Sequence, residues 1–104
     1  MKIYNKLVRD KIPKIIIDSD KDFDFHIATN GEAKNLLHAK LDEEVAEFHS
    51  NPEDLEELAD IMEVVFALAK NLGYSEDELL NKRLEKRHDR GCFDDNIVLE
   101  KVYD

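Results

Sequence analysis

Carboxylates recur at helical spacing in two neighbouring pieces of the chain, EEVAE at 43–47 and ELAD at 57–60. At 100° per residue, Leu41 and Phe48 share one apolar face of a helix. Glu44 lies on the same face, three residues after the first and four before the second. An ordinary surface role is a poor explanation for an acid inside an apolar stripe. This placement therefore marks Glu44 as a candidate functional residue.

The same helical spacing selects three further acids. Glu47 lies at the edge of the apolar stripe, one turn after Glu44, and Glu43 lies a little beyond that edge. In the second piece, Glu57 is bordered by apolar residues and Asp60 follows one turn later. The spacing therefore nominates four carboxylates as candidate metal ligands: Glu44, Glu47, Glu57 and Asp60.

Four carboxylates brought together need a neutralising charge. Two like charges about 4 Å apart repel by roughly 4 kcal/mol at an effective dielectric near 20. Protonation, an intruding basic side chain or a hard divalent cation would each supply the balance, and we expect the cation. Oxygen ligands without histidine or cysteine favour Mg²⁺ or Mn²⁺. Mg²⁺ held by carboxylates keeps positions for water and phosphates, so the expected substrate is a phosphate ester or anhydride.

Composition limits the alternatives. Because 25 of the 104 residues are acidic, a salt-bridged or solvated cluster is the competing interpretation of the acids. The formal net charge of −10 and the absence of a long basic run disfavour nucleic-acid binding. A single cysteine, no apolar run of membrane length and no signal-like start predict a soluble cytoplasmic protein that does not use a membrane. The length predicts one domain, 1–104.

The elements that must position these acids are predicted to be helices, in a mainly α fold. Thr29 and Ser75 each begin a capping box, Pro52 is expected in a first helical turn, and Gly73 is expected to end a helix. On the third helix, the apolar stripe that includes Leu58 and Met62 is expected to face the core. The predicted helices span about 10–18, 30–49, 52–72 and 76–89.

The link between the second and third predicted helices is only a few residues long. Helices joined this way pack as an antiparallel hairpin, so we expect a helical bundle built on 30–49 and 52–72 with the two acidic pieces face to face. Alternating apolar residues also predict a small β pairing of 23–28 with 97–102. Acids on the inner faces leave little apolar burial, so the chain is expected to form a homodimer or a higher homo-oligomer.

The order of the motifs resembles the MazG-type all-α nucleotide pyrophosphohydrolases, including their phosphoribosyl-ATP pyrophosphohydrolase-like branch. Their signature, EExxE followed by ExxD, is matched at 43–47 and 57–60. YNKLVRDKIP at 4–13 resembles the start of a compact subgroup described as predicted house-cleaning enzymes. RGCF at 90–93 resembles the RGGF tail of that subgroup, with Cys92 in place of the second glycine.

The resemblance implies hydrolysis of a nucleoside triphosphate to the monophosphate and pyrophosphate. It implies that Mg²⁺ is held by Glu44, Glu47, Glu57 and Asp60. Glu43 would bind a second ion, or orient or deprotonate the attacking water. Cations form charge-assisted bonds with phosphates, so basic residues near both termini are candidates for substrate binding. These candidates are Arg9 and Arg90 first, then Lys6, Lys11, Lys86 and Arg87.

Two other classes of function stay open. A non-catalytic helical interaction module would use its acidic face to bind a basic partner. A nucleotide-sensing module would bind nucleotide without turning it over. Metal-dependent release of pyrophosphate distinguishes the enzyme from both.

Overall fold

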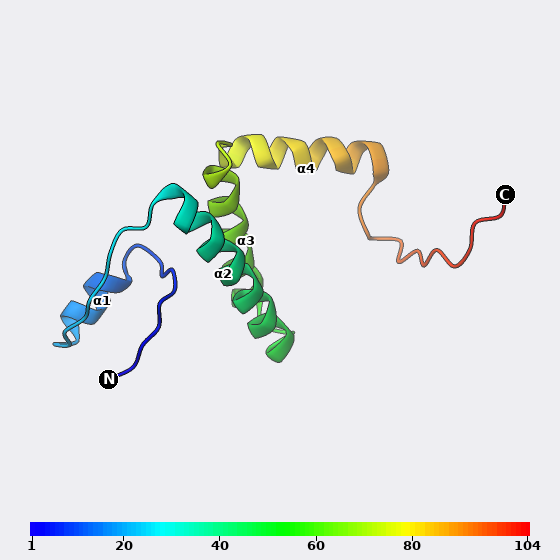
Figure 1. Cartoon of the computed structure of the whole chain (residues 1–104). Coiled ribbons are helices and arrows are strands. Elements are labelled where there is room, and N and C mark those ends of the chain that lie inside the picture. Colours follow the sequence, from blue (N-terminus) through cyan, green and yellow to red (C-terminus); the bar gives the residue numbers. More distant parts are fainter.

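The computed structural model describes all 104 residues as four helices joined by irregular segments, without a strand (Figure 1). The helices are α1 (Ile12–Asp18), α2 (Asn30–Ser50), α3 (Leu55–Asn71) and α4 (Glu76–Arg90). The predicted mainly α fold is therefore confirmed. None of the helices is both long and apolar enough to span a membrane.

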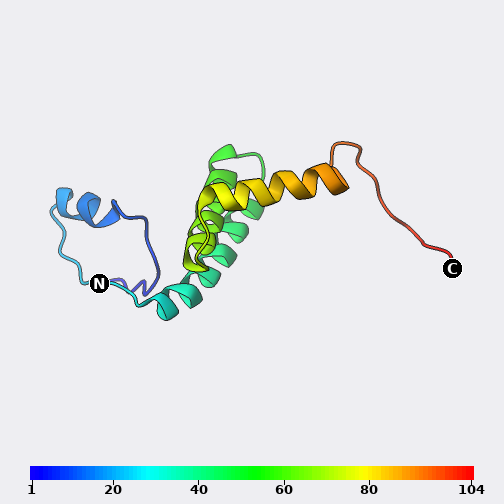
Figure 2. The same cartoon turned by 90° about the horizontal axis from the view of Figure 1, so that it is seen from above.

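α2 and α3 form the predicted hairpin and lie side by side in both views (Figures 1 and 2). Thr29 caps α2, because its hydroxyl accepts a hydrogen bond from the backbone N–H of Glu32 at 3.2 Å. Asp54 caps α3 by accepting from the N–H of Glu56 at 2.9 Å. The predicted start of α3 at 52 is therefore three residues early. Pro52 lies in the turn, because the capping carboxylate follows it.

The end of α3 turns the chain into α4. Gly73 adopts a φ of 95°, and its N–H donates to the carbonyl of Lys70 at 2.9 Å, while the N–H of Tyr74 donates to Ala69 at 2.9 Å. Ser75 and Glu78 then complete the predicted capping box. α4 points away from the hairpin at this end, and only its first half has partly covered leucines, Leu79 and Leu80 (Figure 1).

One sequence prediction about the terminal regions is wrong. Segments 23–28 and 97–102 do not pair, because α4 directs the C-terminal segment away from the hairpin in a molecule measuring 62 × 31 × 24 Å (Figure 2). The rings of Phe23 and Phe25 instead stack on each other, with centroids 5.5 Å apart. The helix predicted at about 10–18 is present as α1, which begins at Ile12 and has no side-chain cap.

The core lies between α2 and α3 and is small. Its buried apolar residues are Leu37, Val64 and Ala69. The face of α3 that meets α2 carries Val64, whereas Met62 on the predicted stripe is 54% exposed. The prediction is only partly right: Ala69 of the predicted stripe is buried, but the rest of the stripe is exposed, because α3 is apolar around most of its circumference and periodicity does not select one face. The exposed members of the predicted stripe are Leu55, Leu58, Met62, Val65 and Leu72.

Candidate metal centre

Four carboxylates meet beside the turn that joins α2 to α3. Each contributes one oxygen, and these oxygens all lie within 4.8 Å of one another. Two come from the last turns of α2 and two from the first turns of α3, so the hairpin brings them together. They are the four acids nominated by spacing: Glu44, Glu47, Glu57 and Asp60.

Glu44 is the most enclosed of the four, with 7% of its surface exposed. Its Oε1 lies 3.3 Å from Nζ of Lys40, whereas its Oε2 is buried without a hydrogen-bond partner. Burial raises the pKa of Glu44, and the adjacent carboxylate of Glu47 raises it further. A buried acceptor without a partner is costly, so Glu44 is suited to a ligand that supplies positive charge.

Glu57, on the opposite helix, resembles Glu44 in its surroundings. Its Oε2 is also buried without a hydrogen-bond partner. The pKa of Glu57 is raised by loss of hydration first, and then by the negative charges of Asp54 and Asp60. Each helix of the hairpin therefore contributes one buried carboxylate oxygen that has no hydrogen-bond partner. Oxygen donors of this kind, without nitrogen or sulfur, fit Mg²⁺ or Mn²⁺.

Basic side chains neutralise part of the acidic charge. Arg9 donates through Nη2 to Oδ1 of Asp60 at 2.7 Å, and Lys40 lies against Glu44. Four carboxylates with these two cations leave a net charge of −2 when all are ionised. This is the charge that one divalent cation would balance, so the donor set fits a single such ion.

Glu43 lies beside the four-carboxylate cluster and has partners of its own. Its carboxylate accepts from Lys6 at 2.7 Å and from Lys40 at 3.5 Å. The hydrogen bond from Lys6 lowers the pKa of Glu43, and the same bond raises the pKa of Lys6. Glu43 is therefore held ionised next to the cluster rather than within it.

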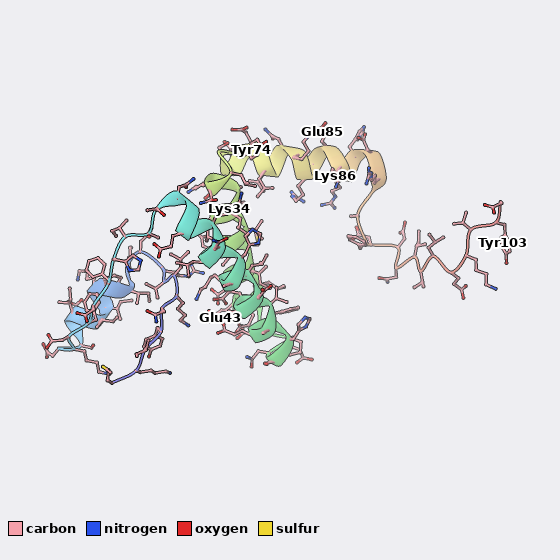
Figure 3. All side chains as sticks on the ribbon, viewed as in Figure 1. Lys34, Glu43, Tyr74, Glu85, Lys86 and Tyr103 are labelled. Atoms are coloured by element: carbon pink, nitrogen blue, oxygen red, sulfur yellow. The ribbon has the colours of Figure 1, made fainter.

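The basic residues predicted to bind substrate are divided by the fold. Lys6 and Arg9 reach the acids through the N-terminal segment. Lys86, Arg87 and Arg90 belong to α4, which leaves from the far end of α3; eleven helical residues, a rise of about 16 Å, separate Asp60 from that end. Figure 3 shows Lys86 well away from Glu43. Within one chain, the cluster and the α4 bases do not meet.

The sequence interpretation missed Lys40. Its spacing to Glu44, four residues along one helix, was a visible signal of an ion pair, since residues at i and i+4 are neighbours on a helix. Comparisons with models of known families, with curated proteins and with solved structures gave no match.

Proposed function

We propose that this chain is a Mg²⁺-dependent nucleotide pyrophosphohydrolase, which cleaves a nucleoside triphosphate to the monophosphate and pyrophosphate. The observation that carries the proposal is the four-carboxylate cluster, in which two buried oxygens have no hydrogen-bond partner. The order of the acid motifs and the N-terminal segment, which resemble the MazG-type enzymes, selects this chemistry among those that use Mg²⁺.

Glu44, Glu47, Glu57 and Asp60 would hold the cation, with Mn²⁺ as an alternative to Mg²⁺. When bound, such an ion neutralises phosphate oxygens and makes water a better nucleophile. The cluster suits this task because it lies at the turn end of the hairpin and Glu47 is exposed. A phosphate chain can therefore approach from solvent while Glu44 stays enclosed.

Glu43 and Arg9 have complementary roles in the proposal. Glu43 is an ionised acceptor beside the cluster, so it orients the attacking water or removes its proton. Arg9, which pairs with Asp60, is the first donor available to a phosphate oxygen, because its side chain is more than half exposed. Lys6 pairs with Glu43 and adds positive charge.

The proposal is tested with a panel of nucleoside triphosphates. Wild-type protein with Mg²⁺ is expected to release pyrophosphate and the matching monophosphate, and excess EDTA is expected to abolish the reaction. Glu44→Gln is expected to lose nearly all turnover, while Glu63→Gln, the same change at an exposed acid of α3, is expected to retain it. Wild-type turnover in Glu44→Gln would refute the site.

The other classes of function give different results in the same panel. Nucleotide-induced stabilisation without product would identify a sensing module. No nucleotide effect, together with a basic protein partner, would identify an interaction module. The proposed substrate would be met in the cytoplasm. A cytoplasmic location accords with the exposed free thiol of Cys92, because the cytoplasm keeps thiols reduced.

A further inference from the structure

The N-terminal arm, residues 1–11, is attached to the α2–α3 hairpin by two ion pairs. Nζ of Lys6 lies 2.7 Å from Oε1 of Glu43, and Nη2 of Arg9 lies 2.7 Å from Oδ1 of Asp60. No backbone hydrogen bond joins the arm to the hairpin, and α1, which follows the arm, packs against none of the other helices. Ten of the eleven residues of the arm are exposed, so apolar burial adds little to the attachment.

This attachment is weak enough to be reversible. All four paired side chains are partly open to water, with exposed fractions between 30% and 57%. An ion pair of this kind shifts an equilibrium by a factor of about five at most, so two pairs favour the attached arm by no more than about thirty to one. Dissolved ions screen exposed pairs, so the arm should detach further as salt rises. A ligand that competes for the same acids can therefore release it.

The arm binds acids of the candidate metal centre. Asp60 belongs to the four-carboxylate cluster, and Glu43 lies beside that cluster. These five carboxylates and the ammonium group of Lys40 leave a charge of −4 when all are ionised. Lys6 and Arg9 reduce this charge by two, and a divalent cation would reduce it by the same amount. The arm and the cation therefore each weaken the attraction that the acids exert on the other.

We propose that the N-terminal arm is an electrostatic strap, which Lys6 and Arg9 fasten to the acids and which detaches when a divalent cation binds. This inference rests on the proposed function, because it needs the cluster to bind the cation. Detachment leaves both basic side chains near the site and free to pair with phosphate oxygens. Coupling between two binding events is reciprocal, so a chain whose arm cannot fasten should bind the cation more tightly.

The distance between two spin labels reports the position of the arm without a measurement of turnover. Nitroxides are attached to Ile3→Cys in the arm and to Ser50→Cys at the end of α2, in a Cys92→Ser background; positions 3 and 50 are both exposed. At low salt without divalent cations, double electron–electron resonance is expected to give a narrow distance distribution. Saturating Mg²⁺ is expected to lower the attached population by about fivefold or more and to broaden the distribution.

Two variants of the labelled chain show whether the ion pairs cause the attachment. Lys6→Gln combined with Arg9→Gln is expected to give a broad distribution without Mg²⁺. Lys2→Gln makes the same change at a cation that lies over the ring of Tyr4, 5.0 Å from its centroid, and it is expected to behave as the wild type. A wild type as broad as the double variant would overturn the strap.

Calorimetry on the unlabelled chains separates failure of the strap from failure of the proposed function. The double variant is expected to bind Mg²⁺ about fivefold more tightly than the wild type. Mg²⁺ binding by the wild type with an unchanged distance distribution would overturn the strap and leave the proposed function standing. An absence of Mg²⁺ binding in both the wild type and the double variant would overturn both.

Discussion

Replacing Glu44 with glutamine removes one charge from the four-carboxylate cluster and nearly preserves the shape of the side chain. Without metal, the wild-type cluster holds like charges together around a carboxylate whose Oε2 has no partner. The variant relieves that repulsion, and its amide can donate a hydrogen bond to a neighbouring carboxylate. We therefore expect Glu44→Gln to be more stable than the wild type in EDTA.

The size of this effect follows from the spacing. A pair of unit charges 4.8 Å apart repels by about 3.5 kcal/mol at an effective dielectric of 20 and by about 0.9 kcal/mol in bulk water. Glu44 has three acidic neighbours, and the attraction of Lys40 at 3.3 Å offsets one of them. The site is open to water on one side, so the lower figure applies and the gain is about 2 kcal/mol. In a domain of this size that gain raises Tm by about 10 °C.

Differential scanning calorimetry in EDTA and in Mg²⁺ measures the Tm of both proteins without and with the cation. At a Mg²⁺ concentration ten times the dissociation constant, binding stabilises the wild type by about 1.4 kcal/mol. The variant is expected to gain little, since it has lost a ligand. The Tm difference between the two proteins should therefore shrink on adding Mg²⁺.

Glu63→Gln provides the matched control, because it makes the same change on the exposed line of α3. Its Tm should follow that of the wild type in both conditions. If Glu44→Gln were less stable in EDTA, the ion pair with Lys40 would outweigh the acidic crowding. If Mg²⁺ stabilised wild type and variant equally, the cation would be bound elsewhere. The first result would contradict the predicted repulsion among the carboxylates, and the second would contradict a cation site that includes Glu44.

Three further predictions concern pH, the N-terminal segment and the hairpin turn. Burial raises the pKa of Glu44 above its ordinary value of 4.5, so the folded state binds the carboxyl proton more tightly than the unfolded state does. The stability that this proton gives to the wild type is lost as pH rises. The Tm advantage of Glu44→Gln in EDTA should therefore grow from about pH 4 to about pH 7, and a constant advantage would contradict this. Arg9→Met frees Asp60 and should tighten Mg²⁺ binding measured by calorimetry while raising KM for nucleotide several-fold; unchanged values of both would exclude a role for Arg9. Asp54→Ala removes the α3 cap and should cost about 1 kcal/mol of unfolding free energy in urea, whereas Pro52→Ala should cost less, and equal losses would argue against the cap.

The hairpin could be predicted from the sequence because its signals are local. Thr29, Gly73 and Ser75 act within a few residues of themselves, and the short link leaves the two helices no arrangement except an antiparallel one. The four acids follow from the same geometry. Their placement beside one turn required only the helical period and the position of that turn.

The predictions that failed concern contacts between segments, which the helical period does not encode. The predicted stripe and the side of α3 that carries Val64 are both apolar, so the sequence could not say which one meets α2. Alternation at 23–28 suggested a strand, but a strand needs a partner, and α4 directs 97–102 elsewhere. The ion pair between Arg9 and Asp60 joins residues 51 positions apart, and nothing in the local pattern predicts it.

The cluster lies wholly within the segment 44–60, folded back by a single turn. Closing so short a loop costs little entropy, so the acids can assemble early during folding, at a rate set by local contacts. In a refolding experiment the metal-binding signal should therefore appear early, and at a rate independent of protein concentration.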